Sequence, residues 1–186
     1  MKKLLLTLVL GAGILIANAQ IEKLAGPRLG FVSISPGPLA DFLHDGFDFD
    51  EEDQYGSTGA AFTTLYGWQW ESRFADGGGE IVGIVEWIVL VGGMEKGMFL
   101  PSASSIIGAR MDNGLELGVG PNLSLSGIGM VFGVGYNFNS GNLNLPINIS
   151  VIPGRAMDGT NMDGTNYEYN TGTRIAVTLG FNMSSK

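Results

Sequence analysis

The single histidine of the chain is the first place to look for catalysis. His44 has Asp41 and Asp45 close by in the sequence, and an imidazole beside a carboxylate can act as a general base. Nucleophilic catalysis also needs a positioned Ser, Cys or Thr, and no motif marks one in this chain. We therefore predict no catalytic residue, no cofactor-binding residue and no cofactor.

An acidic stretch contains this histidine and continues beyond it. The segment DFLHDGFDFDEEDQ (41–54) has alternate carboxylates at Asp48, Asp50 and Glu52, and carboxylate oxygens are ligands that Ca²⁺ prefers. The spacing of an EF-hand loop is missing, so the sequence predicts a solvated acidic loop and no metal site. The phenylalanines of the same stretch indicate a contact surface, because exposed aromatic side chains favour binding.

The other charged residues must be placed by the elements that carry them, and those elements alternate. Between Gly118 and Val151, apolar side chains such as Phe132, Val134 and Tyr136 take turns with Gly, Ser and Asn. This is the period of a β-strand, in which neighbouring side chains face opposite sides of the sheet. No convincing helical periodicity follows Ala19, so we predict an all-β protein.

Eight strands account for most of the chain. They cover residues 28–35, 58–71, 80–91, 98–109, 115–124, 128–138, 143–152 and 173–183. Tight connections rich in Gly, Asn and Asp suit antiparallel hairpins, whereas residues 36–57 and 153–172 form two long loops at one end. The third strand is apolar on both faces, so a buried helix at Ile81–Val91 is an alternative there. The tandem MDGTN motif (157–166) is interpreted as a local duplication within a polar loop.

The composition of the two faces indicates which side of the sheet meets water. In the last four strands, the face opposite the apolar one is largely Gly, Ser, Asn and Thr. A soluble barrel would carry many charges on its outer face. Small and polar residues suit the narrow lumen of an eight-stranded barrel. We therefore predict an antiparallel up-and-down eight-stranded transmembrane β-barrel, with bulky apolar side chains outward and glycines such as Gly133 and Gly180 inward.

Charged residues inside the strands are few, and alternation assigns them to the lumen. A charge facing lipid at mid-depth costs about 2–4 kcal/mol, which favours the inward position. Like charges in a dry lumen must pair with Arg or be protonated. We predict a luminal Arg–Glu network that plugs the barrel. Its members are Arg28, Glu71, Glu86, Glu116 and Arg174.

The start of the chain predicts export. MKKLLLTLVLGAGILIANA has a basic start, an apolar run and a small-x-small site ending at Ala19. This is the pattern of a cleaved signal peptide, and the run is short for a membrane-spanning helix. We predict a signal peptide over residues 1–19 and a barrel domain over 20–186. The net charge of −8 argues against a nucleic-acid partner, since nucleic acid is bound through excess Lys and Arg.

Aromatic residues lie near strand ends on the face assigned to lipid. With a periplasmic N-terminus, the second, sixth and eighth strands run toward the periplasm. Aromatic rings are enriched at membrane interfaces, so we predict a periplasmic aromatic girdle. Its members are Trp68, Trp70, Tyr136, Phe138 and Phe181.

In its alternating strands, its turn lengths and its predicted signal peptide, the chain resembles the small eight-stranded outer-membrane barrels of Gram-negative bacteria, the OmpA/OmpX type. The string YGWQWE (66–71) is also similar to part of a group of uncharacterised exported bacterial proteins. The resemblance implies an outer-membrane location, contact with outer-membrane lipid, and a structural or interaction role. An extracellular partner would bind at loops 36–57 and 153–172. Many barrels of this type end on an aromatic residue, whereas here Phe181 is followed by Asn-Met-Ser-Ser-Lys.

Two other functions stay open at this point. The first is a soluble secreted β-barrel that binds a small apolar ligand, in which Phe132, Ile147 and Leu179 would pack together in a common centre. The second is an outer-membrane enzyme that modifies lipid or peptides and uses His44.

Overall fold

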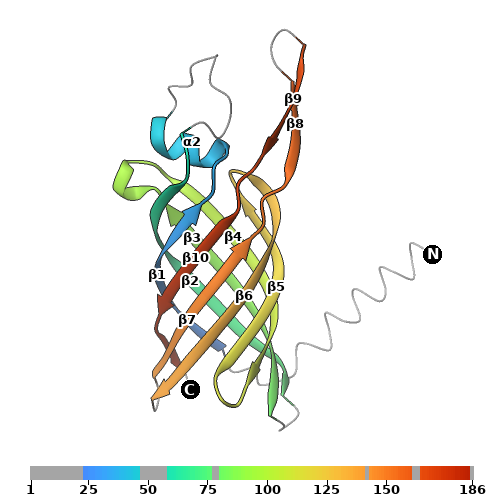
Figure 1. Cartoon of the computed structure of the whole chain (residues 1–186). Coiled ribbons are helices and arrows are strands. Elements are labelled where there is room, and N and C mark those ends of the chain that lie inside the picture. The colour runs from blue at the N-terminus through green and yellow to red at the C-terminus, as the bar shows by residue number, and fades with distance from the viewer. Residues whose placement is uncertain (1–22, 47–57, 77–79, 141–142, 161–163, 185–186) are drawn as a thin grey trace, which may run out of the picture.

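The protein is a closed barrel of eight antiparallel strands, as Figure 1 shows. The structure, a computed structural model, describes residues 23–46, 58–76, 80–140, 143–160 and 164–184; the predicted signal peptide lies outside these residues. Each strand pairs with its neighbour in the chain, and the last pairs with the first. The barrel strands are β1 (Lys23–Ile34), β2 (Ala61–Asp76), β3 (Ile81–Gly92), β4 (Leu100–Met111), β5 (Leu115–Ser124), β6 (Gly127–Ser140), β7 (Leu143–Ile152), and the pair β10 (Arg174–Gly180) and β11 (Asn182–Ser184), which together form the eighth.

The apolar side chains face outward, which confirms the predicted orientation. On β6, Phe132 is 51% exposed, whereas the preceding Val131 is 2% exposed and points into the barrel. Phe132 lies opposite Val119 of β5 and Val151 of β7, so one register keeps the apolar residues of three strands on one surface. Ile147 and Leu179 are also exposed on the outside. A soluble barrel with these residues in its centre is therefore contradicted.

Several strand boundaries differ from the prediction because pairing continues beyond the clear alternation. β1 begins at Lys23, since Lys23 and Ser72 are paired across β1 and β2. β2 continues to Asp76 through an irregularity between Arg73 and Ala75 in its pairing with β3. The helix considered for Ile81–Val91 is wrong, because these residues pair along both β2 and β4.

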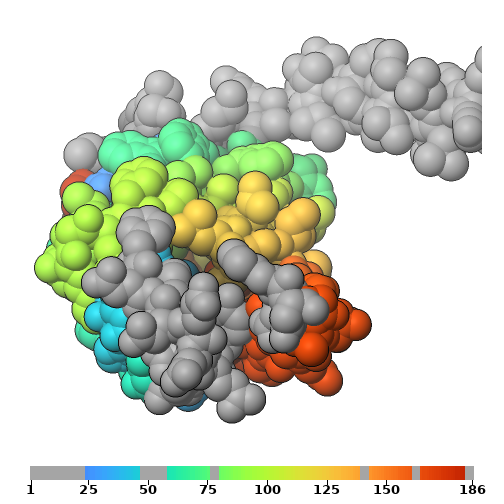
Figure 2. All heavy atoms as spheres, turned by 90° about the horizontal axis from the view of Figure 1, so that it is seen from above, coloured from blue at the N-terminus to red at the C-terminus, as the bar shows by residue number. Residues whose placement is uncertain are grey.

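Both predicted long loops contain secondary structure, which corrects the sequence interpretation. The first holds α2 (Pro38–Asp45), which starts with a proline suited to the first helical turn. The second holds a hairpin, β8 (Ala156–Thr160) and β9 (Asn166–Asn170), in which Met157 pairs with Tyr169. Viewed along the barrel axis, α2 and the hairpin lie over different parts of the rim (Figure 2). We call this end of the barrel the loop end and the opposite one the turn end.

The helix α2 has an apolar side that packs on the barrel. Ala40 and Leu43 are buried in one cluster with Val32, Leu65 and other residues of the upper strands. A short turn of 3-10 helix, η2 (Met94–Lys96), joins β3 to β4 beside it, and the Lys96 ammonium donates a hydrogen bond to the Leu43 carbonyl oxygen at 2.9 Å. Within the part of the chain that the structure describes, no helix has the length and apolar character to cross a membrane.

Candidate functional site in the barrel lumen

A buried ion-pair cluster crosses the lumen in the half nearer the turn end. The Arg110 guanidinium donates two hydrogen bonds of 2.6 Å to the two carboxylate oxygens of Glu71. Its Nε donates a third, of 2.5 Å, to Glu116. Arg110 lies on β4 and Glu71 on β2, so this contact passes over β3 and bridges the interior. A bidentate pair of this kind fixes the geometry of both partners.

A second chain of contacts lies beside the first. Arg28 Nε donates to Gln69 Oε1 at 2.9 Å, and the Gln69 amide donates in turn to Glu86. Arg28 Nη1 also donates to Asn182 Oδ1 at 2.8 Å, which ties β1 to the last strand. The two chains meet at β2 and β3, where Glu71 and Glu86 are cross-strand partners.

We call these six residues the luminal charge cluster: Arg28, Gln69, Glu71, Glu86, Arg110 and Glu116. Every one of them is at most 8% exposed. The cluster joins two guanidinium groups and three carboxyl groups, and the hydrogen bonds between them make it a dense polar layer. Buried charges are tolerated when they are paired and hydrogen-bonded in this way.

The structure thus brings four of the predicted luminal residues together and separates the fifth. Arg174 lies at the first position of β10, near the loop end, and its Nη1 donates to Ser124 Oγ at 2.5 Å. Arg110 and Gln69 were not among the predicted members. The predicted fourth strand ends at residue 109, whereas β4 continues to Met111 and includes Arg110. Its position two residues after Gly108 and four after the inward-facing Ile106 is the signal that identifies it as inward-facing.

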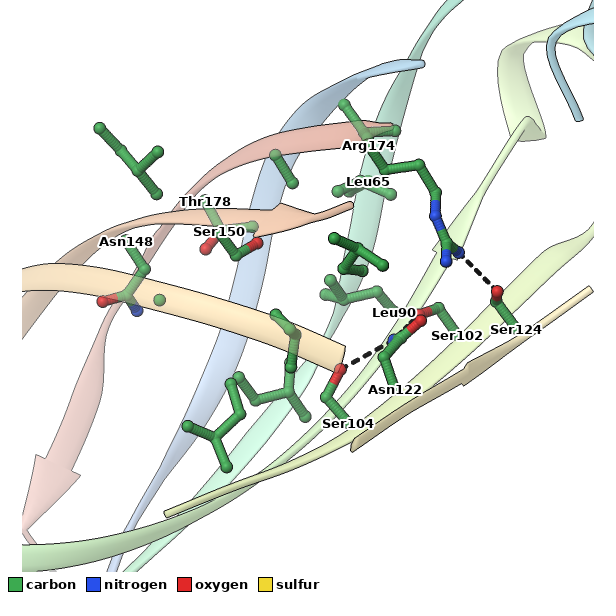
Figure 3. Close-up of a pocket in the computed structure, with 18 of the residues that line it drawn as sticks. Leu65, Leu90, Ser102, Ser104, Asn122, Ser124, Asn148, Ser150, Arg174 and Thr178 are labelled. Atoms are coloured by element: carbon green, nitrogen blue, oxygen red, sulfur yellow. Dashed lines mark hydrogen bonds between the residues drawn. The ribbon is translucent and has the colours of Figure 1, made fainter. Parts of the chain in front are cut away.

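A cavity lies between this cluster and the loop end. It has a volume of about 110 Å³, and Glu86 and Glu116 are among the residues that line it. Its lining includes the apolar side chains of Leu65 and Leu90 and the polar side chains of Asn122 and Arg174 (Figure 3). Among the described residues, the ion pairs expected of the predicted plug therefore lie only in the half of the lumen nearer the turn end.

Inward-facing glycines have two different surroundings. A Cβ at Gly180 would overlap the Arg28 guanidinium, and one at Gly135 would overlap the Asn148 amide, so these positions have no space for a side chain. At Gly133 the nearest atom to an added Cβ is the Gly118 carbonyl oxygen at 3.9 Å. Gly133 therefore faces open space, and it lines the cavity.

All five residues of the predicted aromatic girdle lie on the outer surface. Trp68 and Trp70 are 42% and 47% exposed, and Tyr136, Phe138 and Phe181 fall in the same range. The rings of Tyr136 and Phe138 are 4.7 Å apart between centroids. Trp87 is the cross-strand partner of Trp70 and is 54% exposed, which makes it a further aromatic on the same surface.

The acidic residues at the loop end form small local contacts. Glu95 of η2 accepts hydrogen bonds from the Thr63 hydroxyl at 2.5 Å, the Thr64 amide at 3.0 Å and the Thr64 hydroxyl at 2.6 Å. Limited burial acts to raise the pKa of Glu95, but these hydrogen bonds outweigh it and lower the pKa to about 2. Glu95 thereby fastens the turn between β3 and β4 to β2.

His44 is exposed, and its Nε2 lies 3.1 Å from the Ala60 carbonyl oxygen. Asp41 is buried and accepts a hydrogen bond of 2.5 Å from the Thr58 hydroxyl. In the described ranges, His44 contacts no Ser, Thr or Cys side chain through a hydrogen bond, and no cluster of metal-ligating residues occurs there. Asp48, Asp50 and Glu52 of the acidic stretch lie outside those ranges.

The chain was compared with known proteins. No protein-family model matches it, and no curated protein matches it. Among solved structures, it is similar to Neisserial surface protein A, with 10% identity, a TM-score of 0.44, and coverage of 88% of this chain and 96% of that one. It is also similar to Ail, the attachment invasion locus protein of Yersinia pestis, with 13% identity, a TM-score of 0.25, and coverage of 87% and 98%. The predicted architecture, a small eight-stranded barrel of the outer-membrane type, is confirmed by the closed strand order and the outward apolar face.

Proposed function

We propose that the protein spans the bacterial outer membrane as a barrel closed to solutes, with a structural role and a binding role at its loop end. The observation that carries this proposal is the division of side chains between the two faces of the wall. Exposed large apolar side chains occur on every barrel strand, whereas the charged side chains of Arg28, Glu71, Glu86, Arg110 and Glu116 are buried inside. Lipid is the solvent that suits such an outer face.

The aromatic residues support the same placement in a bilayer. Phe138 and Phe181 lie near the turn end of β6 and of the last strand. Trp68, Trp70 and Trp87 lie in the middle of β2 and β3, because β2 continues to Asp76 and does not end at the tryptophans as predicted. Phe31 and Phe62 lie nearer the loop end, with ring centroids 5.3 Å apart. Aromatic rings at both borders of an apolar band are typical of membrane barrels. We assign the turn end to the periplasm and the loop end to the cell exterior, because outer-membrane barrels have short periplasmic turns and longer external loops.

The luminal charge cluster supports a closed barrel. Its side chains meet across the interior through hydrogen bonds of 2.5–2.9 Å. An ion that crosses this layer would have to separate Arg110 from Glu71 or Glu116. Breaking a buried pair of this kind costs about 3–5 kcal/mol, so the layer acts as a plug.

The loop end supplies a surface for an extracellular partner. It combines α2 and the β8–β9 hairpin on one rim, and these two elements belong to the predicted contact segments 36–57 and 153–172. Tyr167 and Tyr169 stack on the hairpin with centroids 5.9 Å apart, and aromatic side chains are enriched where proteins bind one another.

Two measurements test this function. Cell fractionation followed by electrophoresis with and without boiling should find the protein in the outer membrane, with a mobility that shifts on heating. In planar bilayers the wild-type barrel should conduct almost no current. The variant Arg110→Ala, which opens the charge cluster, should conduct measurably if it stays folded, while Arg155→Ala at the rim should behave as wild type. A soluble protein would overturn the membrane assignment, and steady wild-type conductance would overturn the plug.

A further inference from the structure

The upper lumen is a cup rather than a packed core. The luminal charge cluster forms its floor through Glu86 and Glu116, and Leu39 of α2 lines its outer end. Gly133 lies in the wall of the cup, and no neighbouring atom is close enough to exclude a larger side chain there. Because glycine weakens a strand, a glycine in front of open space indicates that the space itself is used.

The strands that line the cup contribute both apolar and polar side chains, several of which Figure 3 shows. The apolar side comes from β1 to β4 and includes Val32, Leu65 and Leu90. The strands β4 to β7 and β10 add polar groups among apolar residues such as Val131 and Ile152. These polar groups are hydroxyls, amides and one guanidinium, from Ser102, Ser104, Asn122, Ser124, Asn148 and Arg174. A guest that suits this lining must have one apolar part and one polar part.

Two of these polar groups lack the partners that buried polar atoms normally have. Asn122 is 1% exposed and donates to Ser102 and Ser104, yet its Oδ1 has no hydrogen-bond partner. The Nε of Arg174 is buried and also unpartnered. Within the described ranges, no carboxylate lies at ion-pair distance from Arg174; the nearby charge is that of Arg155, a second cation.

We propose that this cup binds a short aliphatic carboxylate. The hydrocarbon chain lies against the apolar side, and the carboxylate accepts hydrogen bonds from Arg174, the geometry that guanidinium groups favour for carboxylates. The volume of about 110 Å³ is smaller than the 150 Å³ of an engineered cavity that holds benzene, so the chain must be short, roughly four to six carbons, with its end extending toward the loop end.

The site goes beyond the proposed structural and binding role and does not depend on it. A barrel that binds no external partner can still hold a carboxylate in its lumen. It also differs from a pore, because the charge cluster closes the floor. The acid would enter and leave at the loop end.

Binding of hexanoate to the folded barrel in detergent tests the proposal. Hexan-1-ol serves as the neutral probe of equal chain length. We expect wild type to bind hexanoate in one saturable site and hexan-1-ol at least tenfold more weakly, because a charge-assisted hydrogen bond contributes about 1.5–3 kcal/mol. Arg174→Gln should lower the affinity for hexanoate tenfold or more and leave that for hexan-1-ol unchanged.

A second variant tests the cavity rather than the charge. Gly133→Leu fills the cup from the wall and leaves the outer face as it is, so it should abolish binding of both probes. Gly133→Ala, which removes little volume, is its matched control and should retain binding. The heat-dependent gel shift verifies that each variant is folded. Equal binding by wild type, Arg174→Gln and Gly133→Leu would mean partition into detergent and would overturn the site, as would an absence of saturable binding to wild type.

Discussion

Replacing Arg110 by methionine should destabilise the barrel strongly. The side chain of Arg110 is 10% exposed, and its partners Glu71 and Glu116 are 1% and 6% exposed. Methionine fills a similar length but donates nothing, so both carboxylates lose their hydrogen-bonded cation in the lumen. Removing one partner of a buried ion pair costs about 3–5 kcal/mol. At 1.4 kcal/mol for each factor of ten, the unfolding equilibrium should shift by about 100-fold to 4000-fold.

Urea unfolding of the refolded barrel in lipid vesicles measures this change. Trp68, Trp70 and Trp87 all face outward, so their fluorescence reports the transfer of the wall from lipid to water. Arg155→Met, which removes a cation from the exposed rim, is the matched control and should change stability by less than about 0.5 kcal/mol.

A triple variant separates the loss of pairing from the loss of packing. In Arg110→Met, Glu71→Gln, Glu116→Gln, no charge of this group remains, so most of the stability lost in the single variant should return. The reasoning fails if Arg110→Met lies within 1 kcal/mol of wild type. It also fails if the triple variant is no more stable than Arg110→Met, because unpaired carboxylates would then not be the cause.

Two further predictions use the same unfolding assay. Gly133→Ala should stabilise the barrel by about 0.5–1 kcal/mol, because alanine costs less than glycine in a strand and the added Cβ meets open space. By contrast, Gly120→Ala should destabilise the barrel by about 1–3 kcal/mol, since the added Cβ would overlap the Ser105 carbonyl oxygen. Equal effects of the two substitutions on stability would contradict the distinction between glycines that face open space and glycines that are closely packed. Glu95 has a folded pKa of about 2 against an ordinary value of 4.5, so the stability advantage of wild type over Glu95→Gln should be full above the ordinary pKa and disappear as the pH falls toward 2. An advantage that does not change with pH would show that the hydrogen bonds to Thr63 and Thr64 are not selective for the carboxylate.

The sequence predicts which face of the sheet each strand residue occupies, but not its height, that is, its position along the barrel axis between the turn end and the loop end. Alternation places Arg28 and Arg174 equally inward, yet one joins the luminal charge cluster and the other lies beside Ser124 near the loop end. Height depends on strand tilt and register, which arise from pairing between strands. Glu71 and Glu86 are far apart in the chain but become cross-strand partners, and alternation within one strand carries no such information.

Short elements and strand ends were the other features that the sequence did not reveal. The helix α2 has eight residues, too few for a clear helical period, and its stability comes from packing on Val32 and Leu65. The sequence does not place Arg110 in a strand, because the turn residues Asp112–Asn113–Gly114 follow it closely. They make the strand appear to end at residue 109, one residue before Arg110. The cavity arises from the combined volumes of residues on eight strands, so no local pattern predicts it.

The outward orientation of the apolar face is the central claim, and cysteine scanning along β6 tests it most directly. The chain has no cysteine, so single variants from Met130→Cys to Tyr136→Cys can each carry one nitroxide in lipid vesicles. Spin relaxation by oxygen, which concentrates in lipid, should be high at Met130, Phe132, Val134 and Tyr136 and low at Val131, Gly133 and Gly135. If oxygen relaxation were high at Val131, Gly133 and Gly135 and low at their neighbours, or did not alternate along β6, the outward orientation would be contradicted. The lumen, the plug and the cup all depend on that orientation.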